Sequence, residues 1–159
     1  MIDCNELGIP PHLHRKGREY DNQFNADEKM FRRYPAYPVE TSKSIIVKEN
    51  FNFDSMSFNR EKYSENPSDV LFSIKDKNHF FRSHKIVSLK VQEIEGLKEI
   101  HPDDQEIYSF KVIHDPEDCM YPHCIVQVLK NGKNVPGIKP SSVKSKIREK
   151  IEKMVDFIE

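Results

Sequence analysis

The chain has 159 residues, of which 36% are hydrophobic and 32% charged, and its formal net charge is −1 at pH 7. That length fits one ordinary domain, and the balanced charge gives no overall reason to expect nucleic acid or an acidic membrane as partner. No segment reaches the roughly 18 consecutive apolar residues that a membrane span requires, so we expect no membrane partner.

The first 24 residues are expected to form an irregular arm. Consecutive prolines, two glycines and mixed charges without apolar periodicity are typical of a long loop. Residues 25–159 are expected to form a single domain. Residues 1–10 contain acidic side chains and lack an apolar run, which is unlike a secretory signal.

The three cysteines are Cys4, Cys119 and Cys124. Without a secretory signal, they are most simply interpreted as free thiols in a reducing compartment. The expected location is therefore the cytoplasm.

The first regular element is predicted to be a short helix from Ala26 to Tyr34. Asn25 and Glu28 have the spacing of a capping box, in which each side chain accepts a hydrogen bond from a backbone N–H at the start of a helix. Apolar residues then fall on one helical face, and Pro35 ends the helix. Further along, the β-branched run within residues 43–48 predicts a strand.

The middle and second half of the chain predict an antiparallel sheet. Residues 69–74 fit either a strand or a helical turn, whereas residues 85–94 and 106–114 alternate between apolar and polar side chains as half-buried strands do. Residues 124–129 are nearly all apolar and predict a more buried strand, ended by an Asn131-Gly132 turn.

The last element is predicted to be an amphipathic helix that runs to the end of the chain. Either Ser141 or Ser142 can cap it after Pro140, and apolar residues then recur at intervals of three and four up to Ile158. We expect this helix to lie across the sheet. The predicted fold class is thus α+β, with a mostly antiparallel sheet, a short N-terminal helix and a longer C-terminal helix packed on one face.

Charge is distributed unevenly along the second half of the chain. Residues 93–118 contain nine acidic and two basic side chains, whereas residues 130–153 contain eight basic and two acidic ones. The favoured interpretation is that the two segments neutralise one another or are simply solvated. The alternative is that the basic end binds a protein or nucleic-acid partner through Lys144, Lys146 and Lys150.

The segment from His114 to Cys124 is the main candidate for chemistry. If the strands on either side of it pair, His114 and His123 lie at the two ends of the connection and could act as acid and base. A zinc site has poor support, because adjacent His123 and Cys124 point to opposite faces of a strand, which leaves three ligands at best. Nucleophilic cysteine has less support still, because acidic neighbours raise the pKa of a thiol at Cys119. Ordinary packing of the histidines is favoured.

A second candidate is the pair Arg32 and Arg33, followed by an aromatic residue. Planar guanidinium groups beside aromatic rings suit binding of phosphate or of a stacked base. The chain has five glycines and none of the nucleotide-binding, hydrolase or metalloprotease motifs. No cofactor is therefore predicted.

Several short motifs resemble a family of small bacterial proteins with an arginine-bearing N-terminal helix and a D-P-x(n)-P-x-H segment near the end. The resemblance implies no activity for any residue and draws attention to Arg32, Arg33 and His123 as a group. The motifs that carry it are Phe31-Arg32-Arg33-Tyr34, Ser57 to Arg60, His114-Asp115-Pro116, Pro122-His123-Cys124 and Asn131-Gly132-Lys133.

Two functions are open from the sequence. The first is a non-enzymatic accessory module that binds a protein or nucleic acid, favoured by the charge asymmetry and by the absence of a catalytic motif. The alternative is an enzyme that uses His114 and His123, with Arg32 or Arg33 holding an anionic substrate such as a phosphoester or nucleotide. The second predicts that these four side chains converge in one cleft.

Overall fold

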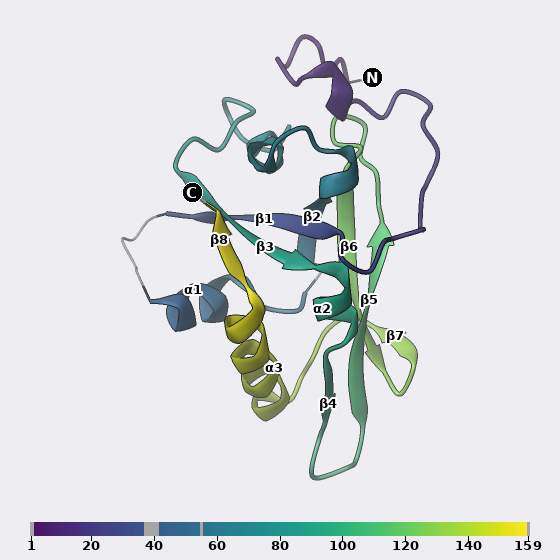
Figure 1. Ribbon diagram of the computed structural model, residues 1–159, viewed down its shortest axis with the longest axis vertical. Coiled ribbons are helices and arrows are strands. Elements are labelled where there is room, and N and C mark those ends of the chain that lie inside the picture. The colour runs from purple at the N-terminus through teal and green to yellow at the C-terminus, as the bar shows by residue number, and fades with distance from the viewer. Residues whose placement is uncertain (1, 37–41, 55, 159) are drawn as a thin grey trace.

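The computed structural model describes residues 2–36, 42–54 and 56–158, and its central feature is a curled antiparallel sheet (Figure 1). The strands found in these residues are β1 (Lys29–Pro35), β2 (Met56–Arg60), β3 (His84–Lys90), β4 (Lys98–Ile100), β5 (Ile107–His114), β6 (His123–Lys130), β7 (Lys133–Val135) and β8 (Asp156–Ile158). The helices are α1 (Lys43–Asn50), α2 (Val91–Glu95) and α3 (Ser141–Met154), with short 3-10 turns η1 (Pro11–Leu13), η2 (Glu61–Tyr63) and η3 (Pro67–Leu71).

Neighbouring strands pair in the order β4-β5-β6-β2-β1-β3-β8, and β7 pairs with β6. The predicted pairing of the strands near 106–114 and 124–129 is confirmed, with Tyr108 opposite Lys130 at one end and His114 opposite Cys124 at the other. The Asn131-Gly132 turn is also confirmed, and both residues have the positive φ angles, 52° and 81°, that a tight hairpin turn requires. The predicted combination of helix and antiparallel sheet is therefore confirmed.

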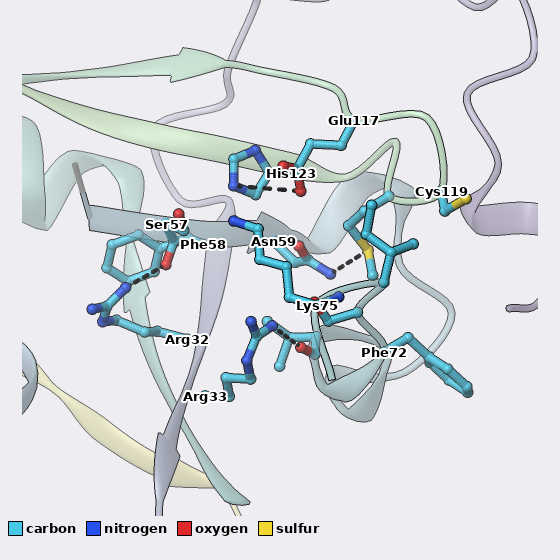
Figure 2. A pocket seen from close by; sticks show the side chains of 14 residues that line it. Arg32, Arg33, Ser57, Phe58, Asn59, Phe72, Lys75, Glu117, Cys119 and His123 are labelled. Atoms are coloured by element: carbon cyan, nitrogen blue, oxygen red, sulfur yellow. Dashed lines mark hydrogen bonds and ion pairs between the residues drawn. The ribbon is translucent and has the colours of Figure 1, made fainter. Parts of the chain in front are cut away.

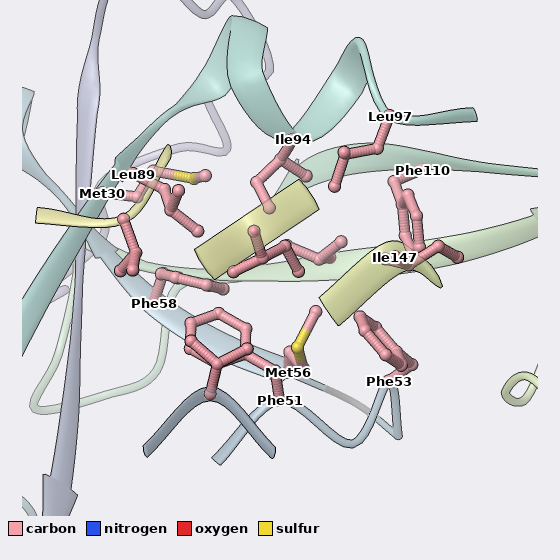
Figure 3. Close-up of a cluster of buried hydrophobic side chains, with 14 of the residues drawn as sticks. Met30, Phe51, Phe53, Met56, Phe58, Leu89, Ile94, Leu97, Phe110 and Ile147 are labelled. Carbon is pink, nitrogen blue, oxygen red and sulfur yellow. The ribbon is translucent and has the colours of Figure 1, made fainter. Parts of the chain in front are cut away.

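The main core lies between the sheet and the three helices. It is rich in aromatic side chains, and all three helices contribute apolar residues to it (Figure 3). From α3 these are Val143, Ile147 and Ile151, each at most 1% exposed. A smaller apolar cluster covers the opposite face of β1 and β3, where Phe31 and Ile86 pack against η3.

The predicted helix over residues 26–34 is wrong, because this segment forms a turn and then strand β1. Met30 packs into the main core and Phe31 into the smaller cluster, so consecutive side chains are buried on opposite faces, as in a central strand. The expected capping box is absent: the Asn25 carbonyl accepts a bond from the Glu28 N–H in a turn, and the Glu28 carboxylate binds Arg60 instead.

The predicted strand over residues 43–48 is wrong as well, because these residues begin helix α1. The Ser42 hydroxyl accepts a hydrogen bond from the Ile45 N–H, which caps the helix. Ile46 and Val47 are buried in the main core, while Ile45 is 38% exposed. Two of the three β-branched residues thus supply the buried face of a helix rather than a strand.

Two further boundaries differ from the predictions. The strand predicted over residues 85–94 ends at Lys90, where helix α2 begins. Helix α3 ends at Met154, and the last described residues form β8, which pairs with β3. The N-cap residue of helix α3 is Pro140, and neither Ser141 nor Ser142 makes a capping hydrogen bond. Residues 69–71, which fitted a strand or a helical turn, belong to η3.

The N-terminal arm lies against the connection between β5 and β6 (Figure 1). A disulfide joins Cys4 to Cys119, so the expectation of free thiols is wrong for these two residues. Ile9 and Leu13 pack with Cys119 in a separate apolar cluster. Cys124 is a buried free thiol, and burial raises the pKa of that thiol.

Of the helices in the described part of the chain, none combines the length and the apolar character that crossing a membrane requires.

Candidate functional site

The connection between β5 and β6 is a tight hairpin tip that positions two polar side chains. Beyond the last strand pair, the Asp115 N–H donates to the His123 carbonyl at 3.0 Å. Glu117 and Met120 then exchange two backbone hydrogen bonds of 3.1 Å each, so the chain reverses over the two residues between them. The tip therefore fixes where Glu117 and His123 lie.

The arm fastens this hairpin tip to the rest of the molecule. The Arg15 N–H donates to the Asp118 carbonyl at 2.8 Å, and the Tyr121 N–H donates to the Leu13 carbonyl at 2.7 Å. These two bonds and the disulfide at Cys119 hold the tip from outside. The irregular arm thus has a structural role at the site.

A pocket of about 270 Å³ lies between the hairpin tip, strands β1 and β2, and the segment after η3 (Figure 2). Its floor contains apolar side chains, among them Phe58, Val70, Phe72 and Met120. Its polar lining consists of Arg32, Arg33, Ser57, Asn59, Ser73, Lys75, Glu117 and His123. Three of the four residues that the enzyme hypothesis brings together therefore line one pocket.

The pocket exists because β1 and β2 pair over a very short length. Their register joins Met30 to Arg60 and Phe31 to Asn59, whereas β1 pairs with β3 along its whole length. Beyond Phe31 the two strands have no further pairs within the described residues, and the Arg32 side chain reaches the backbone of β2 instead. The hollow thus lies where the hydrogen-bonded pairing of β1 with β2 stops, and arginine side chains from β1 line it.

Arg32 is held in place by backbone carbonyls. Its Nε and Nη2 donate to the Asn50 carbonyl at 3.1 and 2.9 Å, and its Nη1 donates to the Ser57 carbonyl at 2.8 Å. The guanidinium lies 5.7 Å from the ring centres of both Phe51 and Phe58. Burial, together with the adjacent charge of Arg33, lowers the pKa of Arg32 to about 10, so it stays charged at neutral pH.

Arg33 points into the pocket and makes fewer hydrogen bonds than Arg32 within the described residues. Its Nη1 donates to the Val70 carbonyl at 2.8 Å, and its guanidinium covers the Phe81 ring at 4.2 Å. Burial lowers the pKa of Arg33, and the more distant carboxylates of Glu117 and Asp76 oppose that shift. Among the residues that the structure describes, no carboxylate lies within 4 Å of either arginine.

His123 faces the arginines from the opposite wall (Figure 2). Its Nδ1 lies 2.7 Å from the Asp115 carbonyl oxygen and 3.3 Å from a carboxylate oxygen of Asp115. Its Nε2 lies 3.9 Å from a carboxylate oxygen of Glu117. The ring is oriented through Nδ1, and its other nitrogen faces the pocket lining.

His114 is not part of this pocket. Its side chain is fully buried, its Nδ1 accepts from the Asp21 N–H at 2.9 Å, and its Nε2 donates to the Tyr121 carbonyl at 2.7 Å. Burial lowers the pKa of His114, which keeps the ring neutral. Both nitrogens are occupied by backbone groups, so His114 secures the arm to the hairpin.

The lysines of α3 lie outside the pocket too. Lys150 Nζ is 2.9 Å from a carboxylate oxygen of Glu99, and Lys146 Nζ is 3.9 Å from the other oxygen. Lys144 borders a separate hollow near Phe53. Part of the basic segment thus pairs with the acidic segment of the same chain, as the favoured interpretation of the charge pattern expects.

The described ranges contain no arrangement of side chains that supports metal binding. No group of three or more histidine, cysteine or acidic side chains there could hold a metal ion. Cys119 is in a disulfide and Cys124 is fully buried in the core, which separates the two thiols considered for zinc.

Sequence reasoning did not select Lys75 or Glu117 as site residues. Lys75 follows an irregular segment that carries no motif. No sequence pattern identifies Glu117 as a site residue. It lies near His123 because the chain reverses over two residues at the hairpin tip. Comparison with protein-family models, with curated proteins and with solved structures found no match, so the function is argued from this geometry.

Proposed function

We propose that this protein binds a small ligand through an anionic group, such as a phosphate or a carboxylate, in the pocket that Arg32, Arg33 and His123 line. The observation that carries the proposal is the partly buried guanidinium of Arg33, which lines the hollow without a carboxylate within 4 Å among the described residues, while Arg32 spans the gap to β2 from the other face of β1. Burial lowers the pKa of Arg33, and an anion would restore the stabilisation that burial removes.

The size and lining of the pocket support the same conclusion. A volume of about 270 Å³ is near the lower end of small-molecule sites, so it suits a compact molecule or a charged head group. A guanidinium offers five N–H donors, and Arg33 uses one of them on a protein carbonyl within the described structure. Its planar fork is suited to two-point binding of phosphate or carboxylate.

The proposal is tested by titrating the labelled protein with inorganic phosphate at low ionic strength and following backbone amide resonances. We expect the largest shifts at residues 32–33, 57–59 and 117–123. Arg33→Gln should weaken binding at least about tenfold, because a charge-assisted hydrogen bond contributes about 1.5–3 kcal/mol.

The matched control is Lys144→Gln, which removes one positive charge outside the pocket. It should leave the affinity for phosphate within about twofold, because an exposed charge acts weakly across solvent. Equal weakening by both variants, or shifts that avoid the pocket residues, would contradict the proposal.

The orientation of His123 supports a second candidate function, acid–base catalysis on an anionic phosphoester or nucleotide. With Nδ1 held by Asp115, Nε2 can accept the proton of a water molecule that attacks phosphorus. The P–O bond to the leaving group then breaks, the departing oxygen takes a proton from water, and His123 returns its own proton to solvent. His123→Gln should abolish hydrolysis of 4-nitrophenyl phosphate while inorganic phosphate still binds; an unchanged rate rejects this candidate.

Partner binding through α3 has less support than the pocket. Its lysines make contacts with Glu99 of the same chain, which reduces the charge available to a polyanion. The cytoplasmic location also loses one of its supports, because it rested on free thiols and a disulfide joins Cys4 to Cys119.

A further inference from the structure

The two walls of the pocket carry opposite charge. Arg33 lies on one wall, and Glu117 and His123 lie on the other, with Lys75 between them in the view of Figure 2. No ion pair joins Lys75 to Glu117 in the described residues, so the acidic wall is not neutralised by the lysine. A ligand in the hollow therefore contacts a cationic end and an acidic end.

The acidic wall contains two hydrogen-bond acceptors that face one another. A carbonyl oxygen can only accept, so the 2.7 Å contact with the Asp115 carbonyl requires a proton on Nδ1 of His123. In the neutral ring, Nε2 is then an acceptor, and it lies 3.9 Å from the Glu117 carboxylate. With the ring neutral, no donor in the described residues lies between these two acceptors.

Charge on this wall favours a cationic donor over a neutral one. A carboxylate oxygen of Asp115 lies 3.3 Å from Nδ1, so His123 has a carboxylate near each of its nitrogens. An ammonium group attracts both carboxylates and supplies N–H donors for Nε2 and for Glu117 at the same time.

Building on the proposed function, we infer that the ligand is a small zwitterion, with its anionic group on Arg33 and an ammonium group between Glu117 and His123. A phosphoester and a carboxylic acid supply equally suitable anionic groups, because a guanidinium fork binds both. The ammonium group at the other end of the ligand distinguishes zwitterions from simple anions of the same size.

Two pairs of probes test the inference by calorimetric titration. O-phosphoethanolamine is compared with ethyl phosphate, and β-alanine with propionate, so that each pair differs by the ammonium group and the two pairs separate phosphate from carboxylate. In at least one pair, the ammonium-bearing member should bind about three- to tenfold more tightly, since Glu117 is about half exposed and its attraction is partly screened.

Two variants assign that difference to the acidic wall. Glu117→Gln keeps the shape of an exposed side chain, and it should remove the preference for the ammonium-bearing member without weakening its partner. Arg33→Gln should weaken both members of each pair alike. Thermal melting of each variant checks that the fold is intact.

The outcomes separate this inference from the proposed function. If both members of each pair bind the original protein equally, or if Glu117→Gln leaves the preference unchanged, the zwitterion is rejected while anion binding stands. If no probe binds and inorganic phosphate does not bind either, both are rejected.

Discussion

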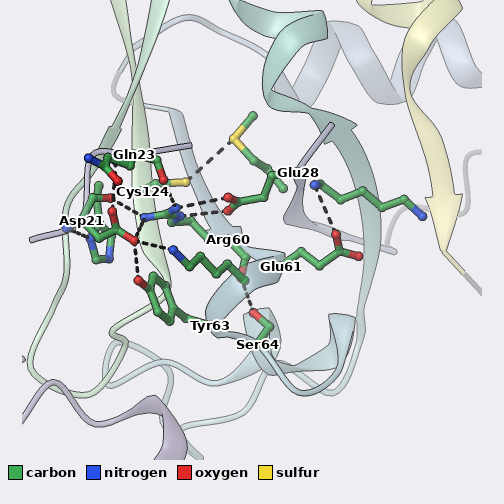
Figure 4. Close-up of polar contacts among 12 residues, drawn as sticks. Asp21, Gln23, Glu28, Arg60, Glu61, Tyr63, Ser64 and Cys124 are labelled. Atoms are coloured by element: carbon green, nitrogen blue, oxygen red, sulfur yellow. Dashed lines mark hydrogen bonds and ion pairs between the residues drawn. The ribbon is translucent and has the colours of Figure 1, made fainter. Parts of the chain in front are cut away.

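Arg60 is a charged residue that belongs to the core of this protein (Figure 4). Its Nε and Nη2 lie 2.9 and 3.1 Å from the two carboxylate oxygens of Glu28, and both side chains are almost fully buried. Its remaining donors reach the carbonyls of Asp21 and Gln23, which belong to the arm. The residue therefore joins β2 to the arm and to the start of β1.

Removing one partner of this buried pair should be strongly destabilising. Arg60→Met leaves the Glu28 carboxylate buried without its cation, and we expect a loss of about 3–5 kcal/mol in the free energy of unfolding, measured in urea. The double variant Arg60→Met with Glu28→Met should recover part of that loss. A single variant as stable as the original protein would contradict the role of Arg60 in the core.

His114 and Asp21 predict a stability that falls as the pH is lowered. Burial lowers the pKa of His114 below its ordinary value of 6.5, so the unfolded chain binds a proton first, and stability should decrease as the pH falls below about 6.5. Hydrogen bonds from Tyr63 and Lys62 lower the pKa of the Asp21 carboxyl, so a second loss of stability should begin as the pH approaches its ordinary pKa of 3.8.

The measurement is the melting temperature at a series of pH values. His114→Gln should reduce the fall in melting temperature below about pH 6.5 and leave the fall at more acidic pH unchanged. A melting curve that does not depend on pH between 7 and 5 in the original protein would show that His114 is not held neutral in the fold.

Strand geometry explains why only one of the two candidate histidines reaches the pocket. His114 pairs with Cys124 across the ladder, and cross-strand partners point to the same face. His123 precedes Cys124 and therefore points to the opposite face. The sequence indicated that the two histidines would be neighbours along the hairpin, but their faces depend on the register, which no local pattern specifies.

At the scale of elements, the arm and its disulfide stabilise the hairpin tip. The disulfide closes a loop with a sequence separation of 115 residues, and we expect its reduction to lower the free energy of unfolding by about 2–4 kcal/mol. Thermal melting with and without a dithiol reductant measures the effect, and Cys4→Ser should melt like the reduced protein and not respond to the reductant.

A chemical count of thiols provides the control. Alkylation of the denatured, non-reduced protein should modify Cys124 alone, as the single free thiol of the cysteines described. Alkylation of three cysteines without prior reduction would show that the arm is not covalently attached.

Helix α3 should be stabilised mainly by its buried face. Ile147 is fully buried in the main core, and Ile147→Ala should cost about 2–5 kcal/mol in the free energy of unfolding. Ile45 on α1 is 38% exposed, and Ile45→Ala provides a control with a much smaller effect. Urea unfolding of both variants gives the comparison, and equal losses would contradict the packing of α3.

Elements in the second half of the chain were predictable because their patterns are long and regular. Strands β5 and β6 carry alternating or continuous apolar residues, and an Asn-Gly pair forms the turn from β6 to β7. Strand β1 and helix α1 were assigned to the wrong class because each is short and its apolar residues fit both periods. Tertiary burial decides such cases: β1 is buried on two faces and α1 on one.

At the scale of the whole molecule, the pocket depends on parts that are far apart in the sequence. Strand β1 supplies the arginines, the hairpin tip supplies Glu117 and His123, and the segment after η3 supplies Lys75. The grouping of Arg32, Arg33 and His123 could be suggested from motifs, but the gap between β1 and β2 that creates the hollow depends on where pairing stops. Sequence patterns do not encode that point.

Charge is also organised at this scale. The acidic and basic segments of the second half meet where α3 contacts β4, and Glu99 pairs there with two lysines. The positive charge of Arg33, which has no carboxylate within 4 Å in the described part of the chain, lies instead at the pocket. Net charge near zero therefore coexists with one local site suited to an anion.

The most direct test of the anion site is a crystal structure of the protein grown with tungstate, a heavy tetrahedral anion of phosphate-like shape. We expect density for the ion in the pocket, within hydrogen-bond distance of Arg33. An empty pocket in crystals that hold tungstate on the lysines of α3 would contradict it.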